Sequence, residues 1–153
     1  METKNSIAQL LLRLALGIGF LLPVMDRLGW LGQPGDPGVG WGNWQHFVDY
    51  THLLIPYVNL PMASFLGILA TVAECVIAVL LIIGYKTRLA ALGSFLLTLL
   101  FAISMLFFLN YRAPFNYSVF VVSFASLLLT KVESYTWSLD AYASRRKKNF
   151  SFI

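Results

Sequence analysis

The sequence predicts an all-α integral membrane protein, a four-helix up-and-down bundle with an interfacial helix in its first loop. Two features of composition and one of charge placement predict this class. Hydrophobic residues make up 58% of the 153 residues and charged residues only 12%, whereas soluble domains are about 45–50% apolar and about 25% charged. Apart from Arg13, the basic residues lie outside the long apolar stretches. A soluble domain has too little interior to hide so much apolar surface, so a lipid bilayer is the expected partner.

The apolar stretches predict four membrane-spanning helices within a single domain. The first stretch has ~19 residues, which cover about 28 Å as a helix, close to the ~30 Å of a hydrocarbon core. It is longer than the apolar part of a typical signal peptide and no small-residue cleavage site follows, so we expect it to be retained. Pro114 can occupy a first helical turn, so we expect the fourth helix to begin there. The predicted spans are residues 7–25, 62–83, 89–109 and 114–130, and residues 131–153 form a basic cytoplasmic tail.

The first loop, residues 26–61, is rich in glycine and proline, which mark turns. It also contains Trp30, Trp41 and Trp44, and tryptophan is stable at the membrane–water interface. Apolar residues recur on one helical face of segment 43–59, which predicts a short helix lying on the membrane surface. An ordered cap over the bundle is an alternative interpretation of the same segment, and the two are compatible.

The placement of basic residues predicts the orientation. The turn between the second and third spans carries Lys86 and Arg88 without an acid, and the tail contains the consecutive basic residues Arg145 to Lys148. Because short cytoplasmic loops are enriched in lysine and arginine, we expect both termini to be cytoplasmic. The tail then faces an anionic inner leaflet. Nucleic acid is not an expected partner, since the other basic residues form no stripe.

Arg13 and Glu74 are ionisable residues well inside the predicted spans. Counted from the cytoplasmic ends of their helices, Arg13 lies ~9 Å deep and Glu74 ~15 Å deep, a difference that an extended arginine can bridge. Consecutive antiparallel helices are usually neighbours. We therefore predict a buried Arg13–Glu74 pair as the candidate catalytic group. Three alternatives stay open: Arg13 reaching back to the interface, Glu74 protonated with one hydrogen bond, and a pair that serves only packing specificity.

A second candidate site, for substrate binding, is expected at the outer ends of the helices. It combines polar residues that follow the first span with those of the third loop, namely Asp26, Arg27, Asn110, Arg112, Asn116 and Tyr117. Together they could form a polar site beneath the aromatic first loop. Anchoring of the helix ends at the membrane interface is the alternative interpretation.

The sequence offers little for a metal or a bound cofactor. Cys75 is the single cysteine, so neither an intramolecular disulfide nor a cysteine zinc site is expected. His46 and His52 are six positions apart, about 120° around a helix, and no histidine lies in a predicted span. Haem between helices, an iron–sulfur cluster and a metal site are therefore not expected in this chain. The aromatic bundle could admit a quinone ring.

Three segments carry a recognisable pattern: LLRLALGIGFLL in the first span, AECVIAVLLIIGYKTRLAAL across the second and third, and APFNYSVF later in the chain. They resemble the DoxX family, which also contains the DoxD subunit of thiosulfate:quinone oxidoreductase. The positions that carry the resemblance are Arg13, Gly17, Glu74, Gly84 and Arg88. The resemblance implies a four-helix protein of the bacterial cell (inner) membrane, loosely associated with redox systems.

One departure from the family pattern concerns the end of the first span. Many relatives carry a His-Gly pair followed by a lysine, whereas this sequence has Pro23 and Val24 at the pair and Arg27 near the lysine. A chemical role of that histidine would therefore be missing here.

Three functions fit these observations. The first is a membrane subunit without its own cofactor, associated with a redox system that passes electrons from sulfur compounds or thiols to quinone through a partner protein. The second is a membrane scaffold or stress-response protein without catalysis. The third is a small transporter component, which would need to form homo-oligomers because one four-helix unit shows no internal inverted repeat. The resemblance favours the first, and whether the chain is itself an enzyme stays open.

Overall fold

The computed structural model describes the backbone of residues 2–150 and the side chains of residues 6–144. Every regular element in this part of the chain is helical, as the composition predicts. In chain order the elements are α1 (Glu2–Arg27), α2 (Trp44–Leu54), α3 (Leu60–Ile83), α4 (Thr87–Ser104), the π-helical turn η1 (Met105–Leu109), α5 (Ala113–Asn116), α6 (Val119–Thr130) and α7 (Leu139–Phe150). The predicted contact of the basic run 145–148 with a membrane falls on side chains outside the described residues.

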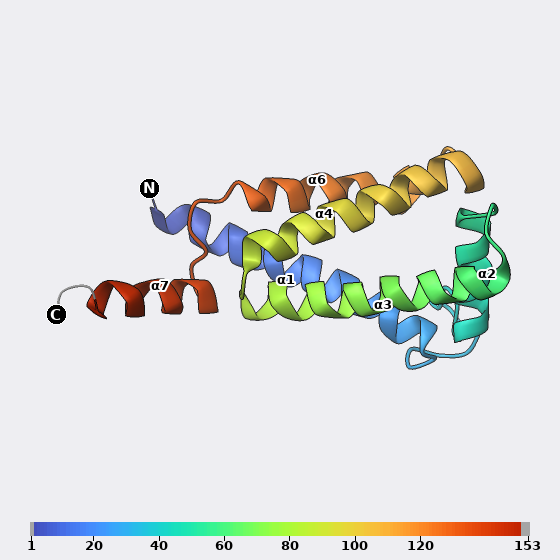
Figure 1. Ribbon diagram of the computed structural model, residues 1–153, viewed down its shortest axis with the longest axis horizontal. Helices are drawn as coiled ribbons and strands as arrows, with labels where there is room; N and C mark the ends of the chain where they lie inside the picture. The colour runs from blue at the N-terminus through green and yellow to red at the C-terminus, as the bar shows by residue number, and fades with distance from the viewer. Residues whose placement is uncertain (1, 151–153) are drawn as a thin grey trace.

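Four helices are aligned along the long axis of the molecule (Figure 1): α1, α3, α4 and α6. α1 packs mainly against α3, and α4 packs mainly against α6. α2 crosses the aligned helices at one end, which we call the loop end because the first loop also lies there. The turn between α3 and α4, the start of α1 and α7 lie at the opposite end, which we call the terminal end.

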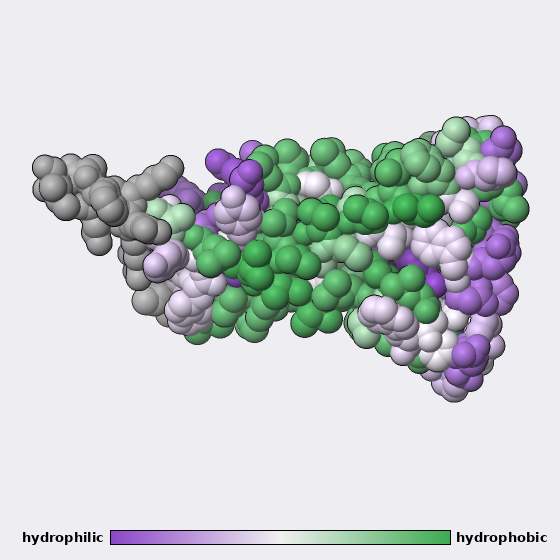
Figure 2. Space-filling model, turned by 60° about the horizontal axis from the view of Figure 1, so that its bottom comes forward, coloured by the Kyte–Doolittle hydropathy of each residue, from purple (hydrophilic) through white to green (hydrophobic). Residues whose placement is uncertain are grey.

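Three helical segments are long and apolar enough to cross a membrane, namely Ser6–Arg27, Leu60–Ile83 and Thr87–Leu109. They overlap the first three predicted spans. On the face that Figure 2 shows, the middle of the molecule is apolar, and hydrophilic residues gather mainly toward its ends. This distribution suits a bilayer, whose hydrocarbon core excludes exposed polar groups.

The fourth predicted span, residues 114–130, is not one continuous helix. α5 ends at Asn116 and α6 begins at Val119, because the backbone of Ser118 is left-handed, with a φ of 54°. A left-handed residue interrupts the right-handed helical path. α6 has 12 residues and is therefore about 18 Å long.

Asparagine and glycine set several helix ends. Asn43 begins α2 and Asn59 begins α3, and each side chain accepts a hydrogen bond from the backbone N–H three positions later, at 2.9 and 3.0 Å. This is the usual role of asparagine at a helix N-terminus. Gly84 ends α3 with a φ of 70°, a conformation that costs glycine little. A Cβ there would lie 2.5 Å from Ser138 Cβ, so glycine also lets the segment before α7 come close.

Small polar side chains join α4 to α6 inside the molecule. Ser94 Oγ lies 2.6 Å from Ser126 Oγ, and the Ser123 hydroxyl donates to Thr98 Oγ1 at 2.8 Å. All four residues are buried. Small side chains let membrane helices approach closely, and hydroxyls can bond across the contact. These residues therefore act in helix packing.

Candidate functional site

A buried ion pair joins the end of α1 to the middle of α3. Arg27 Nη2 lies 2.7 Å from Glu74 Oε2. This is the only ion pair within 4.0 Å among the described side chains. Both side chains are almost completely buried. The contact therefore joins two opposite charges inside the molecule and links α1 to α3.

Arg27 reaches Glu74 because its side chain runs back along α1. Helical side chains lean toward the helix N-terminus. Arg27 Nε donates to the Pro23 carbonyl at 3.0 Å, and Nη1 donates to Thr71 Oγ1 at 2.8 Å. The Arg27 guanidinium thus lies about one helical turn closer to the α1 N-terminus than the Arg27 Cα atom does. At this level it meets the residues of α3 that it binds.

Aromatic rings from the loop end cover this pair. The Arg27 Cζ atom lies 3.9 Å from the centroid of the Phe47 ring and 5.4 Å from that of Trp41. Both distances are in the range of a cation–π interaction. Gly67 makes room for Phe47, since a Cβ at Gly67 would lie 3.0 Å from its ring. The guanidinium is therefore held between a carboxylate and aromatic faces.

Asp26 holds the first loop in place beside the pair. Its carboxylate accepts hydrogen bonds from the backbone N–H groups of Gly40 at 2.8 Å, Trp41 at 3.2 Å and Gly42 at 3.0 Å. Asp26 is buried, and such charge-assisted bonds are stronger than neutral ones. This carboxylate fixes the position of Trp41.

The predicted Arg13–Glu74 pair is wrong, because Arg13 binds backbone carbonyls instead. It donates to Leu81 O at 3.0 Å and Ile82 O at 3.4 Å, and to two carbonyls of the segment before α7, Thr136 O at 3.2 Å and Trp137 O at 3.3 Å. The last carbonyls of a helix lack intrahelical donors and carry a partial negative charge. Arg13, which is 1% exposed, therefore caps α3 and ties it to the later segment.

The physical reason for this error is the axial register of α1 against α3. Gly17 packs close to Ile82, since a Cβ at Gly17 would lie 2.6 Å from Ile82 Cγ1. Arg13, one turn earlier, is therefore level with the end of α3. A Cβ at Gly84 would lie 2.7 Å from Arg13 Nη2. Glu74 lies ten residues before Gly84 in α3, about 15 Å away and beyond the reach of Arg13.

The residues of the predicted outer site divide into two groups. Asp26 and Arg27 bind the first loop, α2 and α3, as described above. Asn110 accepts a hydrogen bond from the backbone N–H of Arg112 at 2.9 Å, and Arg112 Nε donates to the Tyr111 hydroxyl at 2.9 Å. Asn116 and Tyr117 are exposed. No hydrogen bond or ion pair joins the two groups among the described contacts.

An aromatic residue lies between the two groups. Tyr50 of α2 is 5.7 Å from Trp41, centroid to centroid. Burial raises the pKa of the Tyr50 phenol, and the neighbouring Tyr117 phenol raises it further. Tyr50 is therefore a neutral group at physiological pH.

Sequence reasoning missed several contacts at the terminal end. Gln9 Nε2 donates to Thr136 Oγ1 at 2.7 Å. The Asp140 carboxylate accepts the backbone N–H groups of Lys86 and Thr87, both at 2.8 Å. An acidic residue directly before a helix can be recognised in a sequence as its cap. Asp140, however, caps α4 from more than fifty positions later in the chain. Spacing alone could not find it.

The described residues contain no cluster of three His, Cys, Asp or Glu side chains that could hold a metal ion. His46 Nδ1 lies 3.1 Å from Trp41 O, and His52 Nε2 lies 2.9 Å from Val58 O. Cys75 is a free thiol of intermediate burial next to Glu74 in the chain.

Comparison with protein families identifies a match to the DoxX model over residues 8–109. The chain belongs to the DoxX family. The matched region covers about two thirds of this DoxX-family chain and includes Arg13, Arg27 and Glu74, so the resemblance seen in the sequence is confirmed. The matched region ends before α5, so it includes Leu81 and Ile82 but not the segment before α7 whose carbonyls Arg13 also binds. Comparison with curated proteins and with solved structures returns no match.

Proposed function

We propose that this DoxX-family chain is a membrane subunit associated with a redox system, in which Glu74 handles protons while a quinone or a partner protein carries the electrons. One observation carries the proposal. Glu74 is a carboxyl that is 4% exposed, lies in a helix long enough to cross a membrane, and is 2.7 Å from the Arg27 guanidinium. Ionisable groups within membrane spans are costly, and they commonly mark the paths of protons or substrates.

The surroundings of Glu74 act on its charge in opposite directions. Burial favours the neutral carboxyl, and Arg27 at 2.7 Å favours the carboxylate. We therefore assign to Glu74, the buried carboxyl of this helix, the uptake and release of protons.

The aromatic cover suits a planar, weakly polar ligand. Phe47 and Trp41 contact the Arg27 guanidinium and each other, with ring centroids 5.4 Å apart. Phe47 is buried, so a quinone ring would stack on the partly exposed Trp41. Reduction of a quinone takes up electrons and protons together. The electrons come from a partner protein that oxidises sulfur compounds or thiols, and the protons pass through Glu74.

The topology that we propose for this role has four spans and both termini in the cytoplasm of a bacterium, with the chain in its inner membrane. α6 serves as the fourth span, extended toward the loop end by α5. The short basic turn at Lys86 and Arg88 then faces the cytoplasm, as the positive-inside bias requires. α2 lies along the outer interface, which agrees with its crosswise direction in Figure 1.

A non-catalytic scaffold is the second candidate, and one observation favours it. The buried charges Arg13 and Asp26 are bound entirely by backbone groups of the same chain. Such contacts order a structure without requiring a substrate. The two candidates differ in whether the Glu74 carboxylate is needed for activity or only for stability.

The test compares quinone reduction by membrane vesicles from native cells that contain or lack the chain, with thiosulfate or a dithiol as donor. Glu74→Gln keeps the shape and removes the charge. We expect this variant to reduce quinone no faster than vesicles without the chain. Glu133→Gln, an exposed carboxylate at the terminal end, is the matched control and should retain full activity.

Helix content and elution volume in detergent must show that Glu74→Gln is folded. Full activity of this variant would remove Glu74 from the mechanism. Equal quinone reduction by vesicles with and without the chain would support the scaffold instead.

A further inference from the structure

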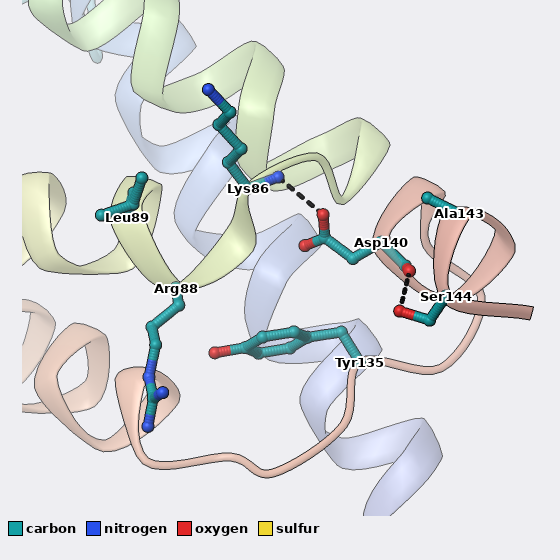
Figure 3. A pocket seen from close by; sticks show the side chains of 7 residues that line it. All are labelled: Lys86, Arg88, Leu89, Tyr135, Asp140, Ala143 and Ser144. Carbon is teal, nitrogen blue, oxygen red and sulfur yellow. Dashed lines mark hydrogen bonds between the residues drawn. The ribbon is translucent and has the colours of Figure 1, made fainter. Parts of the chain in front are cut away.

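A shallow hollow of about 400 Å³ lies at the terminal end of the molecule, between the start of α4 and the start of α7 (Figure 3). Its lining residues are Lys86, Arg88, Leu89, Tyr135, Asp140, Ala143 and Ser144. The hollow is far from the Arg27–Glu74 pair, which lies toward the other end of α3. It takes no part in the function proposed above.

The residues that line the hollow carry a net positive charge, because Lys86 and Arg88 outnumber Asp140. Asp140 is the acid among its lining residues, and both of its carboxylate oxygens accept backbone N–H groups at the start of α4. Arg88 Nε donates to the Thr130 carbonyl at 2.9 Å. Among the side chains of residues 6–144, neither Lys86 nor Arg88 has a carboxylate within 4.0 Å.

The two cations border the hollow from different sides. Figure 3 shows the Tyr135 ring between Arg88 and Asp140, while Lys86 extends in the direction opposite to Arg88. Burial raises the pKa of Tyr135, although Arg88 acts in the other direction. The phenol is therefore neutral and adds no negative charge. Cations placed apart suit an extended anionic group better than a small ion.

An apolar stripe runs from the hollow along α4. Leu89 lines the hollow and is 62% exposed. The residues that continue its face of the helix, three or four positions apart, are also exposed leucines: Leu92, Leu96 and Leu100. The stripe lies on a helix apolar enough to cross a membrane, so a hydrocarbon chain is the natural contact for it.

We propose that this hollow binds the headgroup of an anionic phospholipid, with one of its acyl chains along the leucine stripe of α4. The position of the hollow in the molecule explains why basic residues and an apolar stripe occur side by side. Lys86 and Arg88 lie where the apolar stripe meets the polar terminal end, which is the level of lipid phosphates in a bilayer. Basic residues at this level attract anionic headgroups. A free phosphate ion has no apolar part that could contact the leucine stripe.

The test measures lipid binding to the delipidated full-length chain in detergent by native mass spectrometry. Phosphatidylglycerol and phosphatidylcholine with the same acyl chains are the probes. The unmodified chain should prefer phosphatidylglycerol. Arg88→Gln and Lys86→Gln should each weaken phosphatidylglycerol binding about fivefold, since one basic residue near a membrane surface contributes on that scale. Arg112→Gln, an exposed arginine at the loop end, is the matched control and should bind as the unmodified chain does.

Three results would overturn the assignment. One is equal binding of the two lipids by the unmodified chain. Another is an equal loss in the Arg112 and Arg88 variants, which would show attraction by overall charge alone. The third is complete displacement of the lipid by millimolar inorganic phosphate, which would show that the stripe contributes nothing. Lys86 is exposed and makes no described side-chain hydrogen bond, so its variant keeps the test valid if Arg88→Gln does not fold.

Discussion

Breaking the Arg27–Glu74 ion pair should destabilise the protein strongly, and unequally for its two members. Glu74→Leu leaves a buried guanidinium, which still binds Thr71 and faces Phe47. Removing one partner of a buried pair costs about 3–5 kcal/mol, and we expect about 3 kcal/mol here because those contacts remain. Arg27→Leu leaves the carboxylate buried and also removes the cation–π contact of about 1 kcal/mol, so we expect about 5 kcal/mol.

The double variant should be less damaging than the sum of the two single variants. It leaves neither charge stranded, so the loss of unfolding free energy should fall short of the sum by at least ~2 kcal/mol. The assay is SDS-induced unfolding in detergent micelles, followed by far-ultraviolet circular dichroism. Additive single effects would refute a direct contact between Arg27 and Glu74.

A matched cycle on Arg13 and Glu74 supplies the control. Arg13 binds the Leu81 carbonyl, which lies seven residues, or about 10 Å, beyond Glu74 along α3. Effects of separate sites add to within ~0.5 kcal/mol, so this cycle should show no coupling. A coupling as large as that of Arg27 with Glu74 would show that the register of α1 against α3 differs from the one described.

Asp26→Ala removes the acceptor of three backbone hydrogen bonds, so the first loop should become a site of limited proteolysis, and unchanged resistance would contradict its role. Arg13→Leu leaves the carbonyls that end α3 unbound and should lower the unfolding free energy by about 2–3 kcal/mol, whereas a loss below ~0.5 kcal/mol would mean that water replaces the cap. In a Cys75→Ser background, an impermeant thiol reagent added outside intact cells should label Gly38→Cys and spare Ser144→Cys, and the reverse pattern would invert the proposed topology. The purified chain should show no haem, flavin or iron–sulfur absorbance, and a stoichiometric chromophore would overturn the expectation that its partner carries the electrons.

The helices could be predicted from the sequence because the signals for them are local. Apolar stretches of membrane length predicted the segments that became α1, α3 and α4 with η1. Asn43, Asn59 and Gly84 stand at helix ends and act there through neighbouring backbone groups. The break at Ser118 was not predictable in this way, because serine rarely adopts a left-handed backbone and no residue type marks it.

The candidate site was predicted only in part. Arg13 and Glu74 were recognised as residues that need a partner, since a charge in an apolar segment is costly wherever it lies, but Arg27 was not. Their partners were assigned incorrectly. Arg13 was paired with Glu74 by counting depth from each helix end, and Arg27 was assigned to the helix end instead of the interior.

Helical structure and a place in a membrane follow from the sequence alone, as does the need to compensate the charges of Arg13 and Glu74. Those properties depend on local hydropathy and on the cost of burying an ion, both of which belong to single residues and short segments. The group that compensates each charge depends on tertiary packing. The register of α1 against α3 arises from contacts between distant residues, such as Gly17 with Ile82. A shift of one helical turn moves a side chain by about 5.4 Å, which is enough to replace one partner by another.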